Sequence, residues 1–494
     1  MSLYAAMRMF NLTKYFWWCT LEINKEWIPV SWALPPSVVG LAAGLAFTII
    51  CPPREVRAQE PIMRVLVEEA PHVRLRADGE KPLLVRGLPN GVQRVRSLNI
   101  RGKKGNLHIA IDGGSGGVLS WDGRKEIRIR TNDLRGIWLG KRRYRGDLLI
   151  NYQGKKLQVV NHLGIEKYLV SVVGSEMPKD WPMAALKAQA VAARTYALKQ
   201  KGSSGLFDVK ATELSQVYKG VESETKTTKK AVRSTRSLVL VHKGRLIHAV
   251  FHSSAGGITE ASEEVWGNQL PYLVSVLDHD HESPYHQWEK PFEERQLRLA
   301  FKEIGGVNHI EVIKKSNTGR VRTARVQGPY GELLVTGKDL RRRLGLNSTF
   351  VRFEMSNSKV LDRTPPKLPL LPNDNLINTQ ERHLGPNYLS SVATIAQPKS
   401  QAPPKNSLKK IVGFGELPDV PKRNRKRIAM VARGFGRGHG VGMSQWGANA
   451  LAQRGQNFRE ILNHYYTGAK IYPYGRLRIS SSRSLQNIDL AFAK

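Results

Sequence analysis

Apolar and polar residues alternate along much of the chain between residues 61 and 160. Ile62–Val67 alternates in part, Glu126–Arg130 alternates throughout, and Leu148–Tyr152 is a further short apolar run. Alternation with a period of two is typical of strands that bury one face. Turn-forming pairs such as Asp122-Gly123 separate the runs. This part of the chain is therefore predicted to be strand-rich.

The pattern then changes to a helical period. The largely apolar run Tyr168–Val173 predicts a strand, and a turn containing Glu176 follows it. From Pro182 to about Lys201 small apolar residues recur at helical spacing, with Pro in the first turn and Gly202 just beyond the end. Glu176 is thus expected on a tight turn between a strand and a helix. Partial desolvation there would raise its pKa and suit it to donate a proton.

Later segments repeat these signals. Ser237–Phe251 reads as two strands joined by a tight turn. Near the C-terminus the glycine-rich stretch Gly434–Gly442 leads into a helix that is expected to end near Gly455. A second helix is predicted to begin at Asn457, because Glu460 stands in the position that completes a capping box.

One long stretch interrupts the pattern. Residues 356–427 hold many of the 26 prolines of the chain among Ser, Asn and Gln, and the stretch ends in a run of basic residues. Such a composition predicts a flexible insertion without a packed core. Strand-like segments, Phe350–Glu354 and Ile428–Ala432, flank it. The insertion is therefore expected to loop out of one domain, with its two ends close together.

The predicted fold class is α+β, with a strand-rich body, antiparallel sheets, a few packed helices and a long disordered insertion. The expected organisation has five parts: a signal peptide or signal anchor (1–58), a β-rich part (59–160), a core that holds the Glu176 turn and its helix (161–355), the insertion (356–427) and the C-terminal part of the core (428–494).

Charge and cysteine content narrow the choice of function. The chain has 77 basic and 41 acidic residues and a net charge of +36, which favours polyanionic partners such as an anionic wall or membrane surface. Both cysteines, Cys19 and Cys51, precede the predicted body, so a disulfide framework and a Cys-rich zinc site are excluded there. Without a helix-turn-helix, zinc-finger or RNA-binding signature, the charge alone does not predict nucleic-acid binding.

The N-terminal region predicts export to the cell envelope, either the periplasm or the cell wall. Ser37–Ile50 carries no charge and has the length of a signal-peptide core, and Val56-Arg57-Ala58 is an acceptable cleavage site. Because uncharged sequence extends back to Trp27, a retained signal anchor is the alternative.

Several short motifs along the chain, taken in order, resemble the SpoIID family, the group of sporulation stage II protein D and amidase enhancers. The resemblance runs from Ile62 to Ile479 and leaves out the insertion. The motifs are Tyr144-Arg145-Gly146, Asn161-His162-Leu163, Glu166–Leu169, Ser175–Pro178, Arg194-Thr195-Tyr196, Gln216–Gly220, His252–Gly257, Glu264–Gly267, Pro271–Leu273 and Gly438–Gln445.

This resemblance implies a lytic transglycosylase that cuts peptidoglycan glycan strands already stripped of stem peptides. The family's catalytic acid corresponds to Glu176. One carboxyl group suffices, because the sugar's own C6 hydroxyl attacks C1 and leaves a 1,6-anhydro-muramyl end without consuming water. An ordinary glycosidase needs a second carboxyl group. No cofactor is expected.

Further residues are candidates for substrate binding: Gln189, Arg194, Tyr196, His252, Ser253, Ser254, His439, Ser444 and Gln445. Each also has a structural interpretation, as a helix residue in a salt bridge, a residue that stabilises a turn, or one that fixes a loop. We expect Glu166 to end a strand and Asp180 to cap the helix. Aromatic rings at Trp181, Trp266 and Trp446 are expected in the core, with sugar stacking as the alternative.

Two departures from the family pattern affect the interpretation. Ala184 stands where family members usually have Glu near the helix start, which bears on activity and its pH profile. Ala211–Ser215 has no Cys or His where some members bind zinc, so no metal is predicted. The alternative function is a wall-binding, non-catalytic enhancer of a cell-wall amidase. The expected partners are peptidoglycan glycan strands and a cell-wall amidase.

Overall fold

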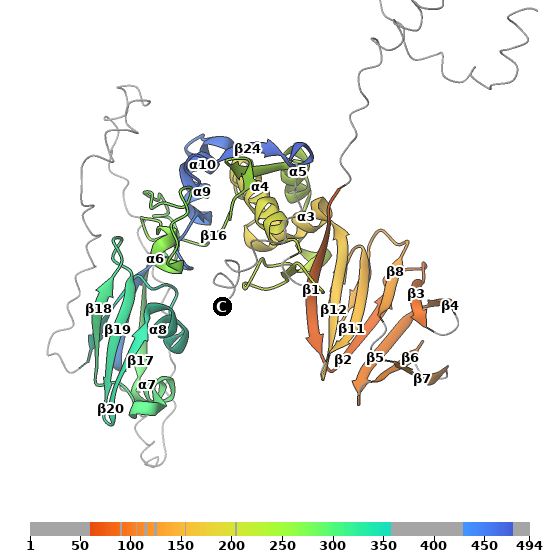
Figure 1. Cartoon of the computed structure of the whole chain (residues 1–494), viewed down its shortest axis with the longest axis horizontal. Coiled ribbons are helices and arrows are strands. Elements are labelled where there is room, and N and C mark those ends of the chain that lie inside the picture. The colour runs from red at the N-terminus through yellow and green to blue at the C-terminus, as the bar shows by residue number, and fades with distance from the viewer. Residues whose placement is uncertain are drawn as a thin grey trace, which may run out of the picture. The chain divides into compact units, whose positions relative to one another are not determined.

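The structure of the protein is a computed structural model. This structure describes residues 60–88, 91–104, 106–112, 116–122, 126–153, 155–202, 205–356 and 428–477. The predicted signal segment and the predicted insertion lie outside the described residues. Among the helices of the described part, none is both long enough and apolar enough to cross a membrane. The described part is strand-rich α+β, with predominantly antiparallel sheets, as the sequence predicts (Figure 1).

Two sheets form the N-terminal part, which we call the two-sheet region. The order of the first sheet is β13 (Val209–Lys210), β1 (Ile62–Ala70), β12 (Lys156–Gly164), β11 (Asp147–Gln153), β8 (Ile127–Thr131), β3 (Leu83–Leu88) and β4 (Gly91–Val95). The order of the second is β10 (Arg142–Tyr144), β9 (Ile137–Leu139), β2 (His72–Ala77), β5 (Ser97–Lys103), β6 (Asn106–Ile111) and β7 (Gly116–Asp122). Apolar residues that alternate along both sheets join one buried cluster, which explains the alternation in the sequence.

The same buried cluster continues into a group of helices around α4 (Met183–Gln200). The neighbours of α4 are α3 (Ile165–Glu176), α5 (Lys226–Ser234), α9 (Gln445–Gln453), α10 (Phe458–Tyr465) and strand β14 (Leu238–His242), which pairs with β15 (Arg245–Leu246) and β24 (Lys470–Pro473) (Figure 1). A helix covered on most sides needs small or apolar residues around most of its circumference. This is why α4 is rich in alanine. Its predicted bounds and the Asn457–Glu460 capping box of α10 are both confirmed.

The predicted strand over Tyr168–Val173 is wrong, because these residues belong to helix α3. A short, continuous apolar run fits a buried helix as well as a buried strand, so its pattern cannot distinguish the two. Consequently Glu176 is the last residue of α3 and does not lie on a separate turn. The helix ends where Pro178 follows Met177, since the residue before proline avoids helical backbone angles.

A buried ion pair joins α3 to α4. Glu166 lies in the first turn of α3, where we expected the end of a strand, and its carboxylate accepts hydrogen bonds from Arg194 Nη2 at 2.7 Å and Nε at 3.1 Å. The Arg194 side chain is fully buried and also donates to the Leu238 carbonyl at 3.0 Å. Because both charges are satisfied inside the core, this pair fixes the two helices and the start of β14 relative to one another.

A second buried cluster belongs to a separate group of strands, which we call the inserted subdomain. It contains β17 (Gln287–Glu293), β18 (His309–Lys315), β19 (Val321–Gly328), β20 (Gly331–Thr336), β21 (Val351–Met355) and β22 (Ile428–Phe435), with helices α7 (Glu294–Ala300) and α8 (Gly337–Leu344). Strands β21 and β22 pair antiparallel, and Met355 lies opposite Met430. The two ends of the predicted insertion are therefore adjacent, as expected.

Replacing Arg194 with Met should lower the free energy of unfolding by about 3–5 kcal/mol, because Glu166 would remain buried without its partner. The double variant Glu166→Leu/Arg194→Met should recover most of that loss, since neither charge is then buried. Urea unfolding of the full chain and both variants, followed by circular dichroism, measures the difference. A double variant no more stable than the single one would contradict this account of the pair.

Candidate active site

The carboxyl group of Glu176 lies half-buried at the C-terminal end of α3. Its Oε1 accepts a hydrogen bond from the Val217 amide at 2.7 Å, and its Oε2 accepts one from Gln445 Nε2 at 3.1 Å. Burial raises the pKa of Glu176, and the two hydrogen bonds oppose that rise without cancelling it. The group therefore keeps its proton to a higher pH than an exposed glutamate does.

The segment that supplies the Val217 amide is held by side chains from several elements. Tyr168 donates to Gln216 Oε1 at 2.9 Å, and Gln216 Nε2 donates to the Ala193 carbonyl at 3.2 Å. The Tyr218 hydroxyl donates to Asn161 at 2.7 Å. The amide that reaches Glu176 is thus positioned by α3, α4 and β12. Gln216–Gly220 is one of the family motifs in the sequence, but nothing in the sequence indicated that its backbone binds the carboxylate.

Gln445 reaches Glu176 from the first residue of α9. Ser444 caps this helix by accepting from the Gly447 amide at 3.1 Å. Strand β16 (Phe251–His252) pairs in parallel with β23 (Met443–Ser444), and the Trp446 amide donates to the Ser253 carbonyl at 3.0 Å. The structure therefore brings together the end of α3, the turn that contains Ser253 and the start of α9.

Two neighbouring histidines lie in the segments that meet here, His252 in β16 and His439 in the loop before β23. His252 is buried, and its Nδ1 lies 3.1 Å from the Val441 carbonyl oxygen. The ring centroids of His252 and His439 are 5.4 Å apart, and His439 Nδ1 accepts from the Val441 amide at 3.1 Å. Burial lowers the pKa of His439 to about 4 and that of His252 well below its usual value. Both rings are therefore neutral near pH 7.

Ser254 stabilises the turn beside the site. Its hydroxyl donates to Asp280, which also accepts from the amides of Gly256 at 2.8 Å and Gly257 at 2.9 Å. The side chain is buried, so its structural interpretation is the one that fits. Ser444 likewise has a structural role, as the cap of α9. The hydroxyls of Ser254 and Ser444 thus stabilise the backbone next to Ser253 and Gln445.

Three candidates on α4 do not reach the carboxyl group. Arg194 is engaged with Glu166 in the core, and Gln189 is fully buried. Tyr196 is half-buried, and burial raises its pKa. Among the described hydrogen bonds, none joins any of these three side chains to Glu176. Tertiary burial decides this, because Arg194 and Gln189 are enclosed in the core and Tyr196 packs against it.

The start of α4 also differs from expectation. Its N-cap is Pro182, which makes no side-chain cap, so the prediction that Asp180 caps the helix is wrong. Proline supplies a suitable backbone angle without any side-chain hydrogen bond. With Ala184 in place, the first turn of α4 contains no acidic residue.

Aromatic rings beside the carboxyl group are more exposed than expected. Trp181 and Trp446 meet edge to face, with ring centroids 4.9 Å apart. Both rings are partly exposed, as is Trp266, whose ring centroid lies 5.7 Å from that of His439. Their expected place in the core is therefore wrong for all three. Trp181 and Trp266 pack against the main buried cluster without being buried themselves.

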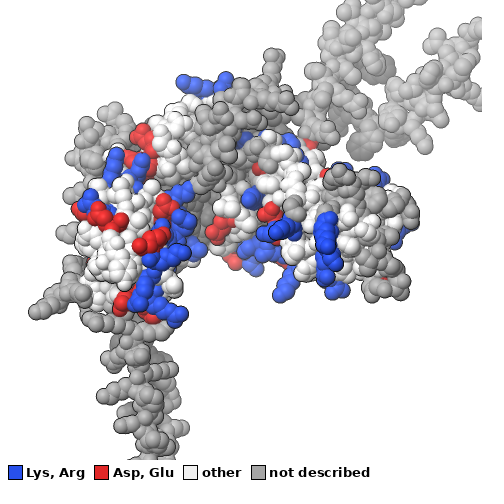
Figure 2. Space-filling view, turned by 60° about the horizontal axis from the view of Figure 1, so that its bottom comes forward, with Lys and Arg blue, Asp and Glu red and all other residues white. Residues whose placement is uncertain are grey.

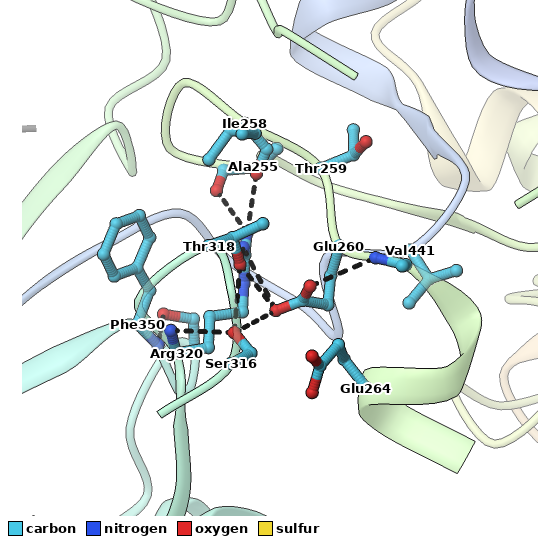
Figure 3. A network of polar contacts seen from close by, with 12 residues as sticks. Ala255, Ile258, Thr259, Glu260, Glu264, Ser316, Thr318, Arg320, Phe350 and Val441 are labelled. Atoms are coloured by element: carbon cyan, nitrogen blue, oxygen red, sulfur yellow. Dashed lines mark hydrogen bonds and ion pairs between the residues drawn. The ribbon is translucent and has the colours of Figure 1, made fainter. Parts of the chain in front are cut away.

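A buried polar network joins the glycine-rich loop before α9, which contains Gly440, to the inserted subdomain (Figure 3). The Glu260 amide donates to the Gly440 carbonyl at 2.8 Å, and the Glu260 carboxylate accepts from Ser316 and Thr318, each at 2.6 Å. Arg320 Nη2 donates to the Ala255 carbonyl at 2.7 Å.

Gly440 passes directly over the Arg320 guanidinium. A Cβ at this position would lie 2.8 Å from Arg320 Nε, and the backbone φ of Gly440 is +85°. Only glycine fits such an approach without strain. No sequence signal pointed to Arg320, because the carbonyls that it binds, those of Ala255 and Ile258, lie 65 and 62 residues away in the chain.

Metal-binding side chains are not gathered at this site. Across the described part of the chain, no group of three or more His, Cys, Asp or Glu side chains is placed to hold a metal ion.

The raised pKa of Glu176 predicts a pH-dependent effect on stability. Because the folded-state pKa exceeds the unfolded value, the ionised carboxylate destabilises the fold once the pH rises through the folded pKa. Glu176→Gln should therefore raise the melting temperature at neutral and alkaline pH, and the gain should vanish below the ordinary glutamate value of 4.5. Calorimetry over this pH range measures it, with exposed Asp180→Asn as the control. A gain that persists unchanged in acid would contradict the assigned cause.

Comparison with known proteins places this chain in a family. The family model for stage II sporulation protein, SpoIID, matches residues 153–242, which include Glu176 and Val217. Stage II sporulation protein D of Bacillus subtilis (strain 168) is 30% identical over 334 residues, which cover 64% of this chain and 76% of that protein.

Two further relatives extend the comparison. An uncharacterised protein of Brachyspira hyodysenteriae is 30% identical over 357 residues, 72% of this chain and 78% of that protein. The amidase enhancer of Bacillus subtilis (strain 168) is 30% identical over 330 residues, 62% of this chain but only 40% of the enhancer. With the match to the family model and the extent of these alignments, the chain belongs to the SpoIID family, that of stage II sporulation protein D.

Proposed function

We propose that the protein is a lytic transglycosylase of the cell wall, which cleaves peptidoglycan glycan strands free of stem peptides and uses Glu176 first as acid and then as base. Family membership supports a role connected with the cell wall, and export to the cell envelope is part of the proposal. The observation that carries the proposal is the half-buried Glu176 carboxyl group with a raised pKa. A general acid works best when its pKa lies near the working pH, and burial moves Glu176 in that direction.

The proposed reaction has two proton transfers and consumes no water. Protonated Glu176 gives its proton to the glycosidic oxygen that leaves C1 of N-acetylmuramic acid, and the C1–O bond breaks. The carboxylate then takes the proton of the C6 hydroxyl of the same sugar, and O6 forms a bond to C1. The products are a free hydroxyl on one sugar and a 1,6-anhydro ring on the other, and Glu176 is protonated again.

The two hydrogen-bond donors fit this cycle. Val217 N and Gln445 Nε2 both donate to the carboxylate, so they stabilise the anion that exists between the two transfers. Burial by itself would favour only the acid form. The balance between burial and donors allows one group to give and then recover a proton.

The surroundings of Glu176 suit a sugar polymer. Trp446, the second residue of α9, and Trp181, whose ring meets it edge to face, both offer partly exposed indole surface, and aromatic rings pack well on the apolar faces of sugars. The charge of one further carboxylate, the exposed Glu213, contributes to the raised pKa of Glu176.

A second candidate function is a non-catalytic enhancer of a cell-wall amidase that binds the glycan. The similarity to the amidase enhancer of Bacillus subtilis favours it, and so does Ala184 at the start of α4, where the family usually has a glutamate. In that case the same surface would hold glycan strands and present them to the amidase.

Glu176→Gln should reduce glycan cleavage by about 10²–10⁴-fold, the usual contribution of general acid–base catalysis. Denuded glycan strands are incubated with the full chain and its variants, and the products are identified by mass. Wild type should release 1,6-anhydro-muramyl ends. Glu213→Gln, which alters a nearby carboxylate of the same kind, should keep most of the activity.

The outcomes of this digestion separate the alternatives. Reducing ends in place of anhydro ends, lost in the Glu213→Gln variant, would indicate a hydrolase with two carboxyl groups. No products from wild type, with glycan binding intact, would support the enhancer. Equal cleavage by wild type and Glu176→Gln would remove Glu176 from the reaction altogether.

Gln445→Ala should shift the pH profile of cleavage. The Gln445 amide lowers the pKa of Glu176, so its removal raises that pKa further. The reaction needs the protonated acid, and its alkaline limb should therefore move to higher pH while the maximal rate falls. Measuring kcat/KM between about pH 4 and pH 9 reports this limb for the free enzyme. A limb that stays in place or moves to lower pH would show that the amide does not act on the carboxyl group.

A further inference from the structure

The outer face of the second sheet presents basic side chains in regular order. In β2, His72, Arg74 and Arg76 are exposed, while Val73 and Leu75 between them are buried. Because side chains of a strand point alternately to the two faces, all three exposed residues lie on the same side of the sheet.

Strand pairing extends this basic row sideways. Arg76 lies opposite Trp138 of β9, Arg74 lies opposite Asn99 of β5, and His72 lies opposite Arg101 of β5. Asn99 and Arg101 are exposed and Trp138 is partly exposed. We call the surface formed by His72, Arg74, Arg76, Asn99, Arg101 and Trp138 the outer arginine face. None of its residues is acidic.

The arginines of this face lack acidic partners. Among the described residues, no ion pair or side-chain hydrogen bond engages the guanidinium group of Arg74, Arg76 or Arg101. On the outer face of the first sheet, Arg128 pairs with Glu126 at 3.5 Å and Arg130 pairs with Asp147 at 2.8 Å. Arg86 and Arg94 on that face are exposed and make no ion pair among the described residues, so only part of its positive charge is compensated. A row of uncompensated cations produces a positive potential that attracts anions, and pairing on the other sheet weakens that potential.

Trp138 holds one of these arginines in place. The guanidinium carbon of Arg76 lies 4.4 Å from the centroid of the Trp138 ring, and that of Arg143 lies 4.9 Å from it. Arg143 is neutralised by Asp78 at 2.8 Å and by Glu222 at 2.7 Å. Arg76 is therefore oriented by the indole while its charge stays available. Because two guanidinium groups stack on the indole, it is a poor platform for a nucleic-acid base.

We propose that the outer arginine face binds a linear, phosphate-bearing polymer of the cell wall. Exposed residues along one strand lie about 7 Å apart and neighbouring strands about 5 Å apart, so the arginines form a close two-dimensional array of cations. Guanidinium groups match phosphate oxygens with paired hydrogen bonds. The face has no exposed large aliphatic residue that would insert into a lipid bilayer.

This inference rests on the proposed cell-envelope role, but it does not depend on the chemistry of Glu176. In Figure 2, several Lys and Arg side chains and few acidic ones show on the right-hand part of the described surface, where the two-sheet region lies. Binding there would hold the protein on the wall through a surface made of strands, separate from the helix ends that carry Glu176 and Gln445.

The test compares two triple variants of the full chain with equal loss of charge. Arg74→Ser/Arg76→Ser/Arg101→Ser removes the outer arginine face. Arg86→Ser/Arg94→Ser/Arg130→Ser removes exposed arginines from strands β3, β4 and β8 of the first sheet and is the matched control. Fluorescently labelled poly(glycerol phosphate) is the probe, and its anisotropy is followed at several salt concentrations. Thermal unfolding checks that both variants are folded.

The first variant should lose about 10-fold or more in affinity, and the slope of log affinity against log salt should fall by about two, as expected when three phosphate contacts are lost. The control should lose less than about 3-fold. Equal losses in both variants would show that net charge alone binds the polymer, and no loss in the first variant would overturn the assignment of the face.

Two further probes distinguish other polyanions. A single-stranded oligonucleotide of equal charge and vesicles containing anionic lipid are titrated in the same way, and both should bind more weakly than the polymer. A selective loss of oligonucleotide or vesicle binding in the first variant, with polymer binding retained, would overturn the proposal in favour of that partner. Cleavage of short, soluble glycan strands should be unchanged in this variant, so failure here and failure of the proposed function can be told apart.

Discussion

The carboxyl group of Glu176 joins parts of the chain that are far apart in sequence. Its two hydrogen-bond donors, Val217 and Gln445, are 41 and 269 residues away. A half-buried carboxylate is costly unless donors satisfy it, so the end of α3, the segment around Val217 and the start of α9 must assemble together. The proposed chemistry and the local fold therefore depend on the same contacts.

Other buried charged groups stabilise the segments that meet at Glu176. The Glu166–Arg194 pair fixes α3 against α4, and Asp280 organises the turn next to Ser253. Arg320, from the inserted subdomain, lies under Gly440 and ties the loop before α9 to its surroundings. Networks of this kind are rigid when every member is satisfied and unstable when one is missing. They explain how a glycine-rich loop can present Gln445 in a defined place.

The proposed cleavage site and the proposed polymer-binding face lie on different kinds of secondary structure. Glu176 and Gln445 lie at helix ends, where backbone and side-chain donors converge on one point. Arg74, Arg76 and Arg101 lie on a sheet, where the pleat spaces like charges evenly over a surface. A convergent site suits a reaction at one bond, whereas an extended array suits a repeating polymer.

Much of this could be predicted from the sequence, because some signals act locally. Alternation identified strands such as β1 and β8, since one face of each is buried. Local capping chemistry identified the start of α10 at Asn457. The family motifs identified Glu176 and Gln445 as candidates, although nothing in the sequence pattern indicated that they touch.

The periodicity of the elements, the caps of the helices and the excess of positive charge follow from the amino-acid sequence, because each arises within a few residues or from composition. Tertiary structure made Tyr168–Val173 helical and committed Arg194 to Glu166. It also brought Asp147 to Arg130, while Arg74, Arg76 and Arg101 have no acidic partner among the described residues. The physical reason is that burial and charge pairing depend on which residues meet across long separations. An apolar run or an arginine looks the same in the sequence whatever partner the fold brings to it.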